Sequence, residues 1–171
     1  MNLAAHTTAD DSARQFLRHT VATLAYRGAK ALRGAPAGFA EFRLPDRIAT
    51  KTRTPGEILA HLGDLLDWAL SMAQGQEEWH NSPVLPWEQG SERFFKALEA
   101  FDACLASDQP LAAPPERLFQ GAIADSLTHV GQIGMLRRLA GAPVRGENYS
   151  RAEIVAGRVG PEQAPPGFEF D

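Results

Sequence analysis

Two polar side chains lie on one side of an otherwise apolar helical stretch. Asp125 and His129 are four residues apart in the run Ile123-Ala-Asp-Ser-Leu-Thr-His-Val-Gly-Gln-Ile-Gly134, so a helix brings both onto the same face, and Gln132 extends that face. A buried carboxylate costs free energy unless a partner compensates it. The spacing therefore indicates either a face exposed to water or a site in which Asp125 has a partner.

A second polar face precedes this one in the sequence. Glu57, His61 and Asp64 fall on one side of a helix predicted from about residue 55 to residue 74. If His61 meets Asp125 and His129 across a helical bundle, two imidazoles and one carboxylate offer three metal ligands and leave coordination positions open, as in catalytic metal sites. Each histidine alone is more typical of a hydrogen-bonded side chain at a helix edge, so the residues by themselves leave both interpretations open.

The elements that must position these residues are predicted from hydrophobic periodicity. The second helix has the clearest start, because Thr54, Pro55 and Glu57 form a capping-box pattern. Four amphipathic helices without a convincing strand pattern predict an all-α fold, a four-helix bundle. Apolar residues recur at helical intervals over about 11–33, 55–74, 91–107 and 115–140.

The length of 171 residues suits one domain with a sizeable core. We expect a single domain over residues 1–171, with the bundle over about 11–145 and a C-terminal extension over about 146–171. Within the extension, a short helix capped by Ser150 is expected at 149–157, followed by an irregular tail rich in proline and glycine.

Charge and composition exclude several classes of protein. The formal net charge is −4, with 17 basic and 21 acidic residues scattered along the chain, so we expect no nucleic-acid partner. Neither a run of about eighteen uncharged apolar residues nor a secretory signal is evident, which predicts no membrane partner. With a single cysteine, Cys104, we expect a reduced, cytoplasmic protein in which this residue is a small buried side chain rather than a reactive thiol.

The two polar faces together resemble a known superfamily. The pairing of Glu57-Ile-Leu-Ala-His-Leu-Gly-Asp-Leu-Leu-Asp-Trp68 with Asp125-Ser-Leu-Thr-His-Val-Gly-Gln-Ile-Gly-Met-Leu-Arg-Arg-Leu-Ala-Gly141 is similar to the DinB/YfiT-like superfamily of metal-binding four-helix bundles. The resemblance covers about residues 11 to 145 and is most specific in the His-Val-Gly-Gln-x-x-x-Leu-Arg run. It implies a divalent metal, usually zinc or nickel, held by one histidine of the second helix and a histidine pair on the fourth.

The resemblance also implies which residues bind the metal. By position, His61 matches the second-helix histidine and His129 matches the second histidine of the pair, whereas Asp125 stands where the superfamily has the first. The implied set of His61, Asp125 and His129 suits zinc and, in other folds, non-haem iron. Members include S-transferases that use the thiols bacillithiol or mycothiol, a maleylpyruvate isomerase and metal-dependent hydrolases. A small-molecule substrate and a homodimer are therefore expected.

Two classes of function follow. In the first, the chain is a metal-dependent enzyme, S-transferase-like or hydrolase-like, in which an open coordination position activates a water or a low-molecular-weight thiol. Glu57, one turn from His61, then acts in proton transfer or supports a ligand. In the second, the chain is a metal-free or degenerate bundle that binds a small molecule or a partner protein, with Asp125 and His129 joined as a hydrogen-bonded pair.

Overall fold

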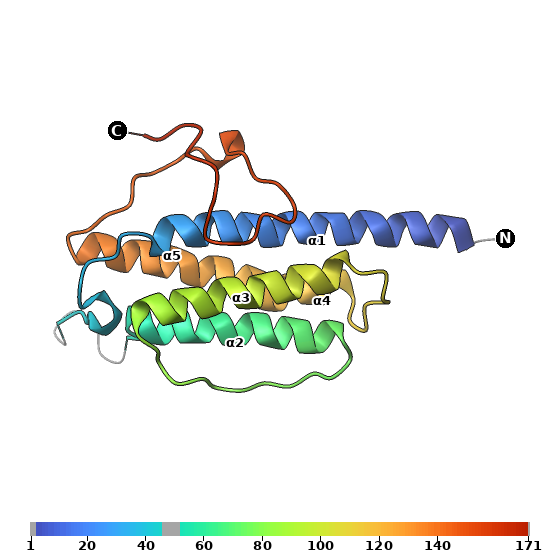
Figure 1. The fold of residues 1–171 in the computed structure, drawn as a ribbon, viewed down its shortest axis with the longest axis horizontal. Helices are drawn as coiled ribbons and strands as arrows, with labels where there is room; N and C mark the ends of the chain where they lie inside the picture. Colours follow the sequence, from blue (N-terminus) through green and yellow to red (C-terminus); the bar gives the residue numbers. More distant parts are fainter. Residues whose placement is uncertain (1–2, 46–51, 171) are drawn as a thin grey trace.

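Four long helical segments form the structure, a computed structural model that describes residues 3–45 and 52–170, with side chains from residue 11 onward (Figure 1). The first three segments are α1 (Leu3–Leu32), α2 (Pro55–Ala73) and α3 (Trp87–Ala106). The fourth runs without a break from α4 (Pro115–Leu118) through a π-helical segment (Phe119–Ile123) into α5 (Ala124–Leu139). Short 3-10 turns at Phe39–Glu41 and Tyr149–Arg151 complete the helical elements of the described residues, which contain no strand. The prediction of an all-helical fold is confirmed.

The helices pack as a bundle in which α1 and α2 each contact both α3 and α5. Because α2 and α3 run in the same direction, the loop 74–86 returns along the length of the bundle (Figure 1). An extended loop of this length reaches about 43 Å, well beyond the roughly 28 Å that the helix α2 spans. The loop therefore crosses the side of the bundle instead of making a tight turn.

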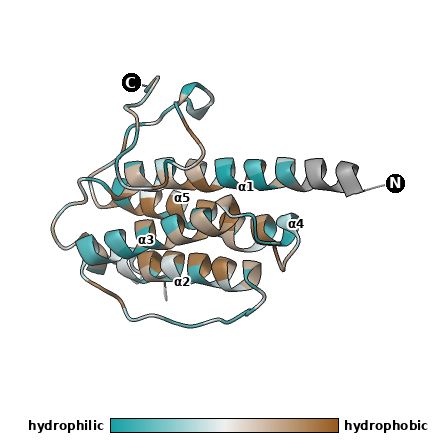
Figure 2. Ribbon diagram, turned by 45° about the vertical axis from the view of Figure 1, so that its right-hand side comes forward, coloured by the Kyte–Doolittle hydropathy of each residue, from teal (hydrophilic) through white to brown (hydrophobic). Residues whose placement is uncertain are grey.

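The core consists of apolar side chains that the helices turn toward one another. Leu24, Leu62, Phe94 and Ile133 are fully buried and come from α1, α2, α3 and α5 in turn. Figure 2 shows hydrophobic residues gathered in α2 and in the interior of the bundle. Burial of a large apolar side chain contributes about 1.5–3 kcal/mol. Among the described helices, none combines the length and the apolar character needed to cross a membrane.

Several predicted boundaries were wrong. α1 begins at Leu3 instead of near residue 11, and α3 begins at Trp87, one turn before Ser91. Ser91 is therefore not the cap of α3, and its hydroxyl donates to the carbonyl of Trp87 within the helix. The fourth helix contains the π-helical segment, which adds a residue to one turn and leaves little trace in a hydrophobic pattern of period 3.6.

The short helix expected at 149–157 is also wrong. Only the single 3-10 turn Tyr149–Arg151 forms, and its cap is Asn148, whose side chain accepts a hydrogen bond from the amide of Ser150. Helices this short are marginal without tertiary support, because the first turn fixes several residues in return for one hydrogen bond. The chain continues from this turn as irregular structure, as expected of the tail.

The C-terminal extension is attached to α1 by buried polar contacts. The hydroxyl of Tyr26 donates to Glu147 Oε1 at 2.6 Å, and Nζ of Lys30 donates to carboxylate oxygens of Glu147 and Glu169, also at 2.6 Å. An isolated antiparallel bridge joins Glu147 to Glu169. Burial and the neighbouring Glu147 raise the pKa of Tyr26, so its hydroxyl remains a donor. The extension therefore lies along α1, as Figure 1 shows.

Arg137 of α5 closes the C-terminal end of α1. Its guanidinium donates to the carbonyl oxygens of Ala31 at 3.1 Å, Arg33 at 2.7 Å and Gly34 at 2.9 Å, and to that of Ala142 at 2.9 Å. The last carbonyls of a helix have no partner within the helix. Burial lowers the pKa of Arg137, but a guanidinium remains protonated in proteins. One buried cation thus joins the ends of two helices.

We expect Arg137→Met to lower the free energy of unfolding by about 3 kcal/mol, because four carbonyl oxygens lose a charged donor at a buried position. Arg138→Met, at the exposed neighbouring position, is the matched control and should change stability by less than about 0.5 kcal/mol. Urea denaturation followed by circular dichroism measures both values. Equal effects of the two substitutions would contradict the role assigned to Arg137.

Candidate metal centre

Three predicted ligands come together where α2 and α5 face each other. Nε2 of His61 lies 3.8 Å from Asp125 Oδ2, and Nε2 of His129 lies 3.6 Å from Asp125 Oδ1. The two imidazole rings meet edge to face, with centroids 4.8 Å apart. One ligating atom of each residue lies within 4.8 Å of those of the other two. The side chains of His61, Asp125 and His129 therefore converge on one point.

The spacing and the donor atoms suit a divalent metal. Tetrahedral zinc with bonds of about 2.1 Å separates its ligand atoms by about 3.4 Å. Here the two Nε2 atoms lie 3.8 and 3.6 Å from different oxygens of Asp125, and one ligating atom of each residue lies within 4.8 Å of the other two. The imidazoles are 17% and 11% exposed, and the Asp125 carboxylate is 48% exposed. The ligand set thus has a buried side and a side open to solvent, as a site with a free coordination position requires.

Gln132 fixes the tautomer of His129. The side-chain oxygen Oε1 of Gln132 lies 2.7 Å from Nδ1 of His129, and an amide oxygen can only accept a hydrogen bond. Nδ1 therefore carries the hydrogen, and Nε2 presents its lone pair on the side of Asp125. In most metal-binding histidines, a hydrogen bond at the ring nitrogen that does not bind the metal orients the ring and raises its basicity.

The surroundings of His61 keep its imidazole neutral. Burial lowers the pKa of His61 below the usual 6.5, the charge of Arg53 and the ring of His129 lower it further, and Asp125 opposes them. A neutral imidazole keeps a lone pair for a metal. The indole of Trp79 meets the ring of His61 edge to face, with centroids 5.6 Å apart.

A cavity of about 450 Å³ opens beside Asp125. Its walls include Trp68 of α2 and two residues of the π-helical segment, Gln120 and Gly121. A Cβ atom on Gly121 would lie 3.4 Å from the Trp68 ring, in van der Waals contact, so the π-helical segment and the indole lie side by side in this wall. π-helical turns occur frequently at functional sites, and this one ends two residues before Asp125.

Glu57 is engaged at the start of α2. Its Oε2 accepts a hydrogen bond from the amide of Thr54 at 2.6 Å, its own amide donates to Thr54 Oγ1 at 3.2 Å, and Arg43 donates to Oε1 at 3.4 Å. The hydrogen bond from the Thr54 backbone lowers the pKa of Glu57, burial opposes this, and Arg43 adds to the lowering. The predicted capping box is confirmed. The role of Glu57 in proton transfer stays a prediction.

Asp64, Asp67 and His80 form a second group with the spacing of metal ligands. The guanidinium of Arg93 already lies between the two carboxylates, with Nη2 at 2.8 Å from Asp64 Oδ1 and 2.7 Å from Asp67 Oδ2. Nη1 of Arg93 also donates to the carbonyl of Ala60 at 2.9 Å. Because α3 supplies the positive charge, we interpret this group as a structural anchor between α2 and α3.

The same anchor holds the loop between α2 and α3. The amide of Ser82 donates to Asp64 Oδ2 at 3.1 Å. Burial acts to raise the pKa of Asp64, but hydrogen bonds from Ser82 and Arg93 outweigh burial, and the pKa lies below its usual value. Fixing Ser82 also restrains Trp79, three residues earlier in the loop, where it packs against His61.

Sequence reasoning missed two residues at the site, Trp79 and Arg53. Both lie in loops, where no periodicity indicates which side chains approach a helix. The only indication in the sequence was that Trp79 lies in a loop with prolines, after the helix that carries Trp68. The indoles of Trp68 and Trp79 are in contact, with centroids 5.9 Å apart. Cys104 is half-buried, and burial raises the pKa of its thiol, as expected of an unreactive cysteine.

The low pKa of Asp64 predicts a pH-dependent stability. As the pH falls, Asp64 takes up its proton first in the unfolded chain, near pH 3.8. The contribution of Asp64 to the free energy of unfolding is therefore present above about pH 4 and lost below it. The loss is at most about 1.4 kcal/mol per pH unit. We expect Asp64→Asn to cost about 3 kcal/mol at pH 7, because Arg93 loses a buried partner, and the difference from the wild type to shrink toward pH 3.

Urea denaturation at several pH values measures this difference. Asp108→Asn, at an exposed position after α3, is the control for the loss of one carboxylate and should cost less than about 0.5 kcal/mol at pH 7. A difference between the wild type and Asp64→Asn that stays constant from pH 7 to pH 3 would contradict this account.

Comparison with known proteins leaves the family of this chain open. The chain matches no family model, no curated protein and no solved structure at a significant level. The resemblance to the DinB/YfiT-like superfamily therefore stays a prediction. The features of the chain that bear on function are the geometry of His61, Asp125 and His129 and the cavity beside Asp125.

Proposed function

We propose that His61, Asp125 and His129 bind a divalent metal ion and that the chain is a metal-dependent enzyme of the S-transferase or hydrolase kind. The observation that carries this proposal is the approach of three ligating atoms, from two helices, to within 4.8 Å of one another at the edge of a cavity. The DinB-like identity, the homodimer and the cytoplasmic location expected from the sequence are proposed with it.

The donor set favours zinc or nickel, and iron also suits two imidazoles and one carboxylate. Compared with three histidines, Asp125 brings a hard oxygen donor and a negative charge. The charge strengthens the attraction of a divalent cation. The charge of Asp125 also reduces the net positive charge of the bound ion. The ion would therefore be a weaker electrophile than one held by three neutral imidazoles.

The metal, when bound, would lower the pKa of a thiol or water beside it, so that a nucleophile forms near neutral pH. The residues of the chain have separate tasks in this scheme. Gln132 orients His129, burial favours the neutral form of His61, and the indole of Trp79 packs edge to face with that ring. An electrophilic substrate would enter the cavity beside Asp125, where the indole of Trp68 offers a flat apolar wall.

Metal analysis tests this proposal. Protein loaded with zinc and then desalted should keep a nearly stoichiometric amount, and His129→Ala should keep at least about tenfold less, because one of three ligands is lost. His19→Ala, at an exposed position on α1, is the matched control and should keep the wild-type amount. His80→Ala should also keep it, if the Arg93 anchor binds no metal. Equal, negligible zinc in the wild type and His129→Ala would refute the site.

A metal-free binding protein is the second candidate. The carboxylate of Asp125 is 48% exposed and borders the cavity, so a small molecule can contact it directly. In this case a chelator leaves the midpoint of thermal unfolding unchanged, whereas removal of a bound metal lowers it. Asp125→His restores the histidine pair of the superfamily. Zinc uptake by this variant alone would favour a degenerate bundle, and uptake by the wild type would favour the enzyme.

A further inference from the structure

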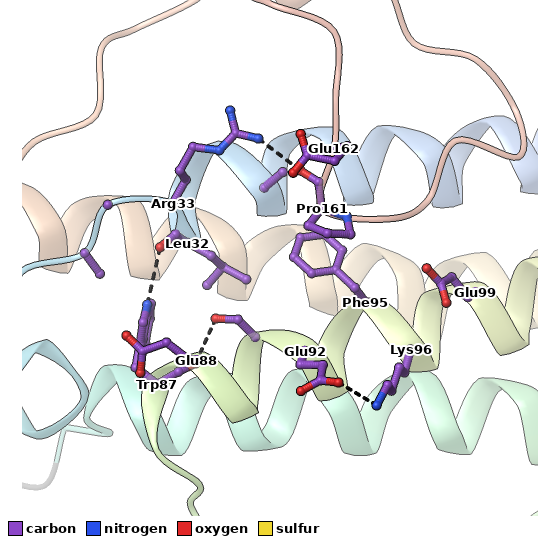
Figure 3. Close-up of a pocket in the computed structure, with 14 residues that line it drawn as sticks. Leu32, Arg33, Trp87, Glu88, Glu92, Phe95, Lys96, Glu99, Pro161 and Glu162 are labelled. Carbon is purple, nitrogen blue, oxygen red and sulfur yellow. Dashed lines mark hydrogen bonds and ion pairs between the residues drawn. The ribbon is translucent and has the colours of Figure 1, made fainter.

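A groove lies between α1, α3 and the C-terminal extension (Figure 3). None of the residues that line it belongs to the candidate metal centre. We call it the α1–α3 groove. Its floor is apolar: Ala29 and Leu32 of α1 and Phe95 of α3 are buried beneath it, and the indole of Trp87 lines it at the start of α3. Its volume is about 560 Å³, in the range of roughly 300–1,000 Å³ typical of small-molecule sites.

The rim of the α1–α3 groove is acidic. Both basic side chains are engaged: Lys96 pairs with Glu92 at 2.6 Å, and Arg33 donates to the carbonyl of Pro161 at 3.0 Å. The remaining rim carboxylates make no hydrogen bond or ion pair with any described residue. The charged groups of the rim are two cations and four carboxylates, Arg33, Lys96, Glu88, Glu92, Glu99 and Glu162.

Two of these carboxylates, Glu99 and Glu162, lie at the part of the groove that α3 and the C-terminal extension form. Glu99 lies against Gly160, where an added Cβ atom would be 3.4 Å from Glu99 Oε1, and Glu162 follows two residues later in the extension. Figure 3 shows Glu162 next to Pro161 and near the Arg33 side chain, and Glu99 farther along α3 than Phe95. This part of the groove therefore combines negative charge, which Lys96 offsets only in part, with an apolar floor.

This combination selects for one class of ligand. Four carboxylates against two cations give the rim a net charge of −2, and the low-dielectric floor strengthens the field that a cation meets above it. An inorganic cation would leave the apolar floor uncovered, and an anion would be repelled. An aromatic wall such as Trp87 attracts organic cations as well as apolar groups.

We propose that the α1–α3 groove binds a small organic amine, with its ammonium group near Glu99 and Glu162 and its apolar body over Leu32 and Phe95. The size of the groove suits a ligand with one ring or a short alkyl chain and leaves room for substituents. The binding energy has two sources: burial of the apolar body on the floor and attraction of the ammonium by the excess carboxylates of the rim, of which Glu99 also interacts with Lys96.

A set of three related probes tests the class of ligand: 2-phenylethylamine, the neutral 2-phenylethanol and the anionic 3-phenylpropionate. The indole N–H of Trp87 donates to the carbonyl of Leu32 at the groove, so its NMR signal reports binding. We expect the amine to shift this signal and to leave those of Trp68 and Trp79 unchanged. The alcohol should bind at least about tenfold more weakly, and the anion more weakly still.

Two variants test the assigned carboxylates. The double substitution Glu99→Gln and Glu162→Gln should weaken amine binding about tenfold and leave binding of the alcohol unchanged. Glu116→Gln, on α4 and outside the groove, is the matched control and should leave both affinities unchanged. The proposal is overturned if millimolar amine leaves the Trp87 signal in place, if all three probes bind alike, or if the double variant binds the amine as the wild type does.

These outcomes are independent of the metal proposal. The lining of the α1–α3 groove includes none of His61, Asp125 and His129. An amine that instead moved the signals of Trp68 and Trp79, which lie beside the candidate metal centre, would overturn the assignment to the groove without bearing on zinc binding.

Discussion

The ion pair between Arg93 and Asp64 joins three parts of the chain on which the candidate metal centre depends. Arg93 belongs to α3, Asp64 to α2, and the second oxygen of Asp64 accepts a hydrogen bond from Ser82 in the loop between them. A buried ion pair stabilises a fold only when its remaining polar atoms are also satisfied, and here the backbone of the loop and of α2 satisfies them. Because α2 and α3 run parallel, the connecting loop must return along the side of the bundle. The hydrogen bond from Ser82 to Asp64 fixes one point of its path. The position of Trp79 beside His61 follows from that path.

The candidate centre combines a local and a non-local condition. The local condition, that Asp125 and His129 share a face, follows from helix periodicity and was predictable from the sequence. The π-helical segment changes the phase of the fourth helix, but it ends at Ile123 and so leaves the relation between these two residues intact. The non-local condition, that this face meets His61, requires α2 and α5 to be neighbours. Periodicity does not supply that pairing, and the expectation of it came from resemblance.

Other features were beyond prediction because they join segments distant in sequence. The α1–α3 groove exists only because the C-terminal extension folds back along α1 and contributes Pro161 and Glu162 to its lining. Arg137 likewise acts on carbonyls more than a hundred residues earlier in the chain. Glu57 is the opposite case, since its capping box was visible in the pattern. The carboxylate that a catalytic role would require is the same one that the cap already uses.

Asp125 distinguishes the candidate metal centre from a site of three histidines, and the difference is electrostatic. Asp125 is 48% exposed, so water solvates its charge, and the cation of Arg53 acts at the same site through its effect on His61. The carboxylate therefore costs little in the absence of a metal, unlike a fully buried one. It also forms no short hydrogen bond with either histidine, since its oxygens lie 3.6 and 3.8 Å from the nearest ring nitrogens. Because no described residue forms a hydrogen bond with this carboxylate, its lone pairs remain available to a cation or polar ligand that enters between α2 and α5.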